Sequence, residues 1–121
     1  MGGRPMEQGE RAERARKLGS LALRSERDGE THVLELIGEL DLDGAPRLEE
    51  ELLRVEASDA AVIIIDLGAL EFIDSTGIRL LLMAADRCKE SARLSLLRGP
   101  RQVHRVFEIT DLVDRLPFAD L

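Results

Sequence analysis

The chain has 121 residues, 44% of them hydrophobic, which fits one folded domain of ordinary size. It carries 24 acidic and 17 basic residues and contains no Trp, no Tyr and three Phe, so direct nucleic-acid binding lacks both the basic surface and the aromatic side chains it needs. The chain has a single cysteine, Cys88, so it cannot form an intrachain disulfide. Residues 1–20 lack the apolar stretch of a signal peptide, and no apolar run is as long as the ~20 residues that cross a bilayer. We therefore expect a cytoplasmic protein without membrane insertion.

Residues 1–20 mix Gly, Pro and charges of both signs without a repeating apolar position, which is typical of a flexible arm. The predicted organisation is therefore a flexible charged leader over residues 1–20 and a single domain over residues 21–121. The leader has a small basic excess, and the predicted domain carries the acidic excess.

Two extended segments open the predicted domain. Leu21–Ser25 comes first, and Thr31–Ile37 follows the turn-forming pair Asp28-Gly29. Such a pair between two extended segments is typical of a hairpin, so we predict two antiparallel strands here.

A helix is predicted to begin at Gly44-Ala45-Pro46, because proline is favoured in the first turn and the preceding Asp43 can cap free amides. The helix is expected to end at Ser58-Asp59. Its apolar residues recur at spacings of three and four and form one inward stripe, made of Ala45, Leu48, Leu52 and Val55.

The continuous β-branched run Ala61–Ile65, closed by Asp66, predicts a central strand covered on both faces. The segment Phe72–Gly77 then leads into a second helix. We expect its core stripe to be Ile78, Leu81, Leu82, Ala85 and Cys88. At 100° per residue the opposite, outer side then holds Thr76, Leu80, Met83 and Arg87.

The last predicted elements are a strand over Arg93–Arg98, a third helix opened by Pro100, and a short element over Leu112–Phe118. The order β-β-α-β-α-β-α predicts an α/β fold with about four strands in a mostly parallel, mixed sheet and flanking helices.

Three kinds of catalytic or metal site find little support. Asp66 ends an apolar strand as in P-loop hydrolases, but the Gly-rich phosphate loop is absent. Ser75 lacks the Gly-x-Ser-x-Gly elbow of a nucleophile. Neither histidine, His32 or His104, lies at a sequence spacing from Ser75 that indicates a catalytic base, and we expect His104 on the surface of the third helix. The acidic residues around Asp41 lack the fixed Gly and closing Glu of a calcium loop, so we expect no metal, no cofactor and no catalysis.

The junction Phe72–Gly77 places two hydroxyls at a helix N-terminus, where free amides and the helix dipole favour an added anion. Ser75 is therefore a good position for a phosphoserine. The alternative is structural, because Asp74 or Ser75 can simply cap the helix.

At this junction the chain resembles the STAS family, specifically the bacterial anti-sigma-factor antagonists, over about Leu21–Phe118. The resemblance rests on four segments in order. They are Gly38-Glu39-Leu40-Asp41, Ala45-Pro46, the run from Ile64-Ile65-Asp66-Leu67 to Phe72-Ile73-Asp74-Ser75-Thr76-Gly77, and Val106-Phe107-Glu108-Ile109-Thr110-Asp111-Leu112. The chain departs from the family at Arg79, Ser91-Ala92 and Asp111, where the family has glycines; Asp tolerates the left-handed helix end expected at residue 111.

The resemblance implies the STAS fold and a protein that binds an anti-sigma factor with serine kinase activity, thereby freeing the sigma factor. It implies that phosphorylation of Ser75, with Thr76 the second choice, releases the partner, that a phosphatase reverses this step, and that Asp41 lies near the site. It also allows a weak homodimer. The expected partner-binding residues are Asp41, Asp74, Ser75, Thr76, Gly77, Arg79, Leu80 and Met83.

Two other functions stay open at this point. One is a STAS subunit that scaffolds a signalling or lipid-transport assembly without being phosphorylated. The other, of a different class, is a small serine hydrolase.

Overall fold

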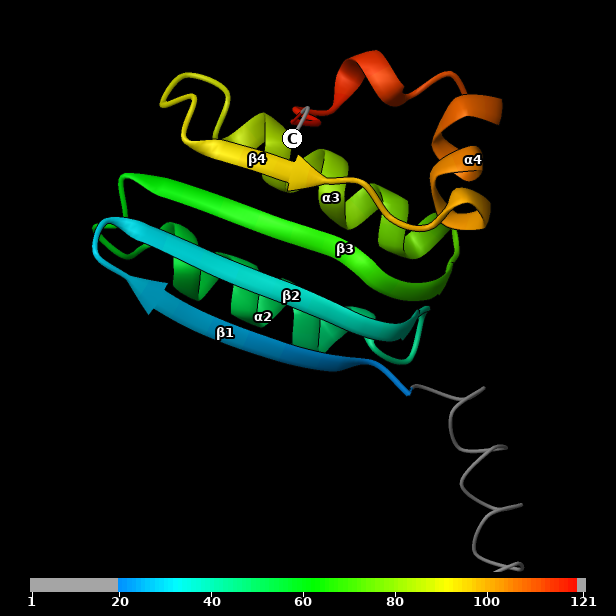
Figure 1. The fold of residues 1–121 in the computed structure, drawn as a ribbon, viewed down its shortest axis with the longest axis horizontal. Helices are drawn as coiled ribbons and strands as arrows, with labels where there is room; N and C mark the ends of the chain where they lie inside the picture. Colours follow the sequence, from blue (N-terminus) through cyan, green and yellow to red (C-terminus); the bar gives the residue numbers. More distant parts are fainter. Residues whose placement is uncertain (1–19, 120–121) are drawn as a thin grey trace, which may run out of the picture.

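The computed structural model describes residues 20–119, so apart from Ser20 the predicted leader lies outside the described residues. The α/β class and the predicted order of elements are confirmed. The elements are β1 (Ala22–Asp28), β2 (Thr31–Leu40), α2 (Ala45–Glu56), β3 (Val62–Ile73), α3 (Ser75–Arg87), β4 (Leu94–Leu97), α4 (Arg101–Ile109) and the short 3-10 helix η1 (Val113–Arg115) (Figure 1).

The four strands form one sheet in the order β1-β2-β3-β4. β1 and β2 are antiparallel, as predicted, while β2 pairs with β3 and β3 with β4 in parallel. Gly29 has a φ of +62° in the two-residue turn between β1 and β2, where primed hairpin turns need a positive φ. The sheet is therefore mixed, with one hairpin and two crossovers.

Helices α2 and α3 lie on the same face of the sheet, α2 behind β1 and β2 and α3 behind β3 and β4 (Figure 1). Burial along β3 therefore alternates: Ile63 and Ile65 are buried, Ile64 is half-buried and Val62 is exposed. The prediction of a strand covered on both faces is wrong, because a run of β-branched residues does not say on how many sides helices pack. Asp66 also does not end the strand, which continues to Ile73.

The buried stripe of α2 is the predicted one, Ala45, Leu48, Leu52 and Val55. The stripe of α3 differs from the prediction, because Leu80 is buried, with 8% of its surface exposed, and Leu82 and Ala85 are only half-buried. The physical reason is that α3 packs against α2 as well as against β3, so its buried arc is wider than one stripe. Leu80 therefore does not lie on the outer side of α3.

The C-terminal segment closes one edge of the sheet. The N–H of Leu96 in β4 donates to the Pro117 carbonyl at 2.9 Å, and the Ala119 N–H donates to the Leu96 carbonyl at 2.8 Å. The ring of Phe118 packs edge-on against His104, with centroids 4.9 Å apart. His104 is thus buried, and its predicted place on the helix surface is wrong.

Asp111 ends α4 with a φ of +62°, so the predicted left-handed helix end is confirmed. The Leu112 N–H donates to the Phe107 carbonyl at 2.8 Å, as in the usual closure of a helix by a left-handed residue. Ala92, the other non-glycine residue with positive φ in residues 20–119, has a φ of +55°.

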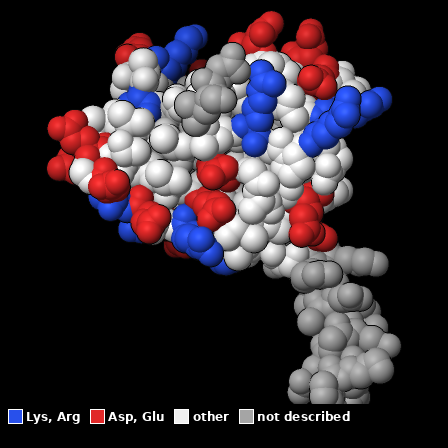
Figure 2. All heavy atoms as spheres, in the orientation of Figure 1, with Lys and Arg blue, Asp and Glu red and all other residues white. Residues whose placement is uncertain are grey.

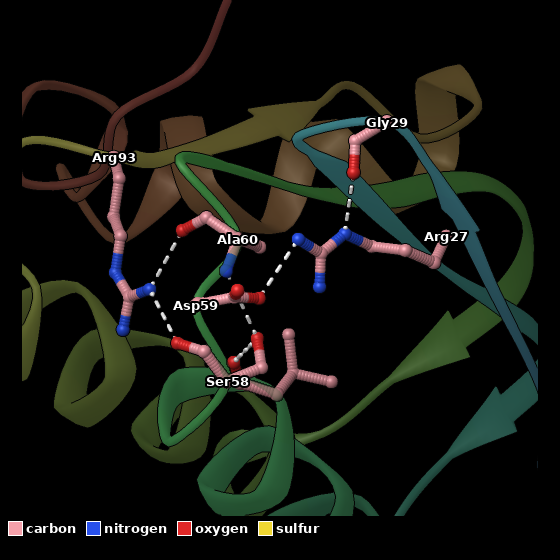
Figure 3. Close-up of polar contacts among 7 residues, drawn as sticks. Arg27, Gly29, Ser58, Asp59, Ala60 and Arg93 are labelled. Carbon is pink, nitrogen blue, oxygen red and sulfur yellow. Dashed lines mark hydrogen bonds and ion pairs between the residues drawn. The ribbon is translucent and has the colours of Figure 1, made fainter.

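Arg93, just before β4, is bonded to carbonyls at the end of α2 and just after it (Figure 3). Its guanidinium donates to the Ala60 carbonyl at 2.8 Å and to the Ser58 carbonyl at 3.2 Å, and it also bonds the Glu56 carbonyl. Nearby, Arg27 of β1 pairs with the exposed Asp59 at 2.9 Å. Arg93 therefore joins the end of α2 to the start of β4.

Candidate functional site

The candidate site lies where β2 and β3 end together. Parallel strands bring their carboxyl ends to one edge of a sheet, and here Leu40 of β2 pairs with Ile73 of β3. The Asp74 N–H donates to the Leu40 carbonyl at 3.1 Å. The loop after β2 and the N-terminus of α3 are consequently held side by side.

Asp74 caps α3. Its backbone is extended, with φ −112° and ψ −176°, and its Oδ1 accepts a hydrogen bond from the Gly77 N–H at 3.0 Å. Its Oδ2 accepts a second bond, at 3.2 Å, from the N–H of Leu42 in the loop before α2. One carboxylate thus serves a helix end and a neighbouring loop at the same time.

The loop itself is organised by Asp41. Its Oδ1 accepts from the N–H of Asp43 at 3.1 Å and from that of Gly44 at 3.2 Å. The predicted cap, Asp43, is exposed, and the N-cap of α2 is Gly44 without a side-chain bond. The prediction was wrong because Asp41 opens a turn, from which its short side chain reaches the amides two and three positions ahead.

Ser75 is the first residue of α3 and is exposed. Within residues 20–119 its hydroxyl has no hydrogen-bond partner, because Asp74 already occupies the capping position. Thr76, the second choice, is half-buried. Of the two hydroxyls, that of Ser75 is therefore the more accessible to a modifying enzyme.

Gly77 allows the close approach of α3 to β2. A Cβ at this position would lie 2.5 Å from Cγ of the fully buried Leu40 and 3.0 Å from Cγ1 of Ile73. The glycine of this junction is thus required by packing, and it fixes the distance of the site from the sheet.

The charges around Ser75 are of both signs. Asp41 and Asp43 lie in the adjoining loop and Asp74 precedes Ser75, whereas Arg79 follows it by four residues and is exposed. Side chains four apart on a helix are neighbours, so Arg79 lies on the Ser75 side of α3. A negative charge added at Ser75 would meet one cation and several carboxylates.

Farther along α3 an open groove of about 1080 Å³ runs between the helix and the C-terminal segment. It is lined by Arg79 and by Met83, which is 40% exposed, on the α3 side, and by Arg115 and Pro117 on the other. The sequence pattern predicted Met83 as a surface residue, but it held no signal that would place residues 114–117 opposite. Cys88 also lines this groove, and burial raises the pKa of its thiol.

Neither of the two histidines, both within residues 20–119, is hydrogen-bonded to Ser75. His32 bonds instead to Ser25 across the hairpin, with Oγ and Nε2 2.5 Å apart, and His104 packs against Phe118. The described residues hold no group of three or more His, Cys, Asp or Glu placed to bind a metal ion. In residues 20–119 no helix is both long enough and apolar enough to cross a membrane.

The predicted site residues thus fall into three groups. Five of them, Asp41, Asp74, Ser75, Thr76 and Gly77, gather at the α3 N-terminus. Arg79 and Met83 continue along the exposed side of α3 into the groove, and Leu80 lies in the core.

The sequence is similar to a STAS family model and to proteins named anti-sigma factor antagonists. A family model described as "Mlab, STAS domain" matches residues 23–117. The chain is 34% identical over 65 residues to the anti-sigma-F factor antagonist RsfB of Mycobacterium tuberculosis, a match covering 54% of this chain and 53% of RsfB. It therefore spans about half the length of that relative. It is 31% identical over 90 residues to the anti-sigma-B factor antagonist of Listeria monocytogenes, covering 74% and 79% of the two chains.

Similar solved structures include two forms of one protein, the Bacillus cell fate determinant SpoIIAA. The unphosphorylated anti-sigma factor antagonist SpoIIAA superposes with a TM-score of 0.66 at 27% identity, covering 82% of this chain and 89% of that one. The phosphorylated form gives a TM-score of 0.62 at 26% identity, covering 82% and 92%. The shared fold is thus seen in a protein with and without a phosphate.

Proposed function

This chain belongs to the STAS domain family, and we propose that it is an anti-sigma factor antagonist controlled by phosphorylation of Ser75. Unphosphorylated, it binds an anti-sigma factor that is also a serine kinase, and thereby frees the sigma factor. Phosphorylation ends the binding, and a phosphatase restores it. The names of its relatives from Mycobacterium and Listeria support the antagonist function.

The observation that carries the proposal is the division of roles between Asp74 and Ser75. Because Asp74 caps α3, Ser75 is exposed at a helix N-terminus and its hydroxyl has no partner in residues 20–119. A phosphate there meets the positive end of the helix dipole, which favours an anion by about 0.3–1 kcal/mol. Modification is therefore compatible with the folded domain.

Release of the partner then comes from the interface. A phosphate adds about −1.5 to −2 charges to a surface that must lose its water on binding. The carboxylates of Asp41, Asp43 and Asp74 lie at the same end of the sheet, so the added charge increases an existing negative potential. An acidic or apolar partner surface would bind such a site more weakly.

The partner surface in this proposal starts at Asp41 and Ser75, includes Thr76 and Gly77, and continues over Arg79 to Met83. Leu80 is left out because it is buried. The protein is a regulator acting in the cytoplasm by protein binding, without a cofactor, catalysis or nucleic-acid contact of its own.

The test is phosphate mapping after incubation with the cognate anti-sigma factor kinase and ATP. We expect one phosphate, at Ser75, and none on Ser75→Ala. Phosphate at Thr76, or modification of Ser75→Ala at the rate of the wild type, would overturn the site assignment. No phosphate despite stable binding of the partner would favour the scaffold alternative, and turnover of an activated ester that depends on Ser75 would favour the hydrolase.

A further inference from the structure

The two edges of the sheet differ. The edge at β4 is covered by the C-terminal segment through backbone bonds of Leu96 to Pro117 and Ala119. The opposite edge is β1, seven residues long, with a continuous register to β2, no proline, and no strand beyond it among residues 20–119. Free edges of this kind offer a row of unpaired N–H and C=O groups to another strand.

We propose that β1 is a homodimer interface, at which β1 of a second copy pairs antiparallel and extends the sheet across both protomers. The proposal does not depend on the proposed function. It rests on the order of charges along β1 and on which backbone groups face outward.

The outward-facing groups follow from the turn. In a two-residue hairpin the residues flanking the turn, here Asp28 and Thr31, form a hydrogen-bonded pair, and bonded pairs then alternate along an antiparallel ladder. The backbones of Asp28, Glu26 and Arg24 accordingly pair with β2. Those of Arg27, Ser25 and Leu23 are directed to the free edge and can pair with a second copy.

One register pairs opposite charges without placing any like charges opposite each other. With Ser25 opposite Ser25 of the second copy, each Arg24 lies opposite a Glu26, which gives two attractive pairs per dimer. Centring the pairing on Arg24, Glu26 or Arg27 places that residue opposite its own copy, with like charges facing. Centring it on Leu23 leaves Arg24 opposite Ala22.

The charged side chains of β1 are exposed. Arg24 is 69% exposed, although it also lies 3.4 Å from Glu35 of β2. The charge of Arg27, which would face Leu23 of the second copy, is already paired with Asp59. Acidic and basic side chains lie side by side along the border where β1 runs (Figure 2).

This interface leaves the candidate site open. β1 is separated from β3 by β2, and α3 lies behind β3 and β4, away from the β1 edge (Figure 1). A dimer formed through β1 can therefore still present Ser75, Arg79 and Met83 to another protein.

The test uses two charge-reversal variants of the full chain in sedimentation equilibrium. Glu26→Arg places Arg opposite Arg in its homodimer, and Arg24→Glu places Glu opposite Glu. We expect the dimer dissociation constant of each variant to rise about tenfold or more, because two attractive cross-strand pairs become repulsive. An equimolar mixture restores opposite charges at both pairs, so it should form a heterodimer about as tightly as the wild type associates.

Matched controls carry the same charge changes elsewhere, Arg105→Glu and Glu90→Arg, and should associate like the wild type. The heterodimer also shows that both variants are folded, and thermal unfolding followed by circular dichroism checks each variant alone. A wild-type chain that stays monomeric at all concentrations overturns the proposal. So does a dimer that neither variant weakens, or a mixture that fails to associate.

Discussion

The side chain of Asp74 accepts a hydrogen bond from the backbone N–H of Leu42, which lies 32 positions earlier in the chain, at 3.2 Å. The other oxygen of the same carboxylate accepts from the Gly77 N–H at 3.0 Å. One residue therefore fixes both the loop before α2 and the first turn of α3, the two segments that surround Ser75.

Replacing Asp74 with Ala should lower the free energy of unfolding by about 1–2 kcal/mol, because a helix cap is lost and the Leu42 amide loses its acceptor. Asp74→Asn keeps an oxygen for the cap and should lose less. Urea denaturation of the three proteins measures the difference. Equal stability of Asp74→Ala and the wild type would show that the two bonds contribute nothing to folding.

The local elements around this site could be predicted from the sequence. The turn pair Asp28-Gly29 and the stripe of α2 gave the hairpin and the helix, because both depend on contacts between residues near in sequence. The choice between Asp41 and Asp43 as the residue that organises the loop could not be predicted. Both carboxylates can reach nearby amides, and only the path of the chain after β2 decides between them.

Packing between distant elements was predicted less well. The burial of Leu80 depends on α2 lying beside α3, and the half-buried Ile64 depends on both helices lying on one face of the sheet. The groove along α3 needs residues 114–117 to return across the helix. These three features depend on contacts between distant segments, so the pattern of apolar residues within one segment cannot predict them.

Arg93 and Arg27 offer a matched comparison of two arginines that bind the same segment, residues 58–60, from either side (Figure 3). Arg93→Ala should lower the free energy of unfolding by about 2 kcal/mol or more, because it leaves the half-buried carbonyls of Ser58 and Ala60 without this donor. Arg27→Ala removes an ion pair to the exposed Asp59 and should have a much smaller effect. Urea midpoints of the two variants check the order, and a larger loss for Arg27→Ala would contradict it.

Substitution of Leu80 should mainly lower stability, whereas substitution of Met83 should mainly weaken partner binding. Leu80→Ser places a hydroxyl in the core and should lower the free energy of unfolding by about 2–5 kcal/mol. Met83→Ser, at a 40% exposed position, should leave the thermal midpoint nearly unchanged and weaken binding of the anti-sigma factor. Thermal unfolding and calorimetric titration measure the two effects, and unaltered affinity of Met83→Ser would place the interface elsewhere.

Ser75→Asp should keep the domain folded, with a thermal midpoint equal to or slightly above that of the wild type, because an anion at the start of α3 is favourable by about 0.3–1 kcal/mol. The exposed Arg79, four residues on, adds to this effect, so the gain should shrink in the double variant Ser75→Asp with Arg79→Ala. The midpoint of Ser75→Asp is compared with that of the wild type, and the midpoint of the double variant with that of Arg79→Ala. Unfolding of Ser75→Asp would mean that phosphorylation acts by disrupting the domain instead of the interface.

The most direct test of the proposed function is release of a sigma factor from a preformed complex with its anti-sigma factor, followed by size-exclusion chromatography. We expect the unphosphorylated chain to free the sigma factor and to elute with the anti-sigma factor. The protein phosphorylated at Ser75, and Ser75→Asp, should leave the complex intact. Failure of the unphosphorylated chain to free any sigma factor at saturating concentration, or equal release by the phosphorylated protein, would contradict the proposed switch.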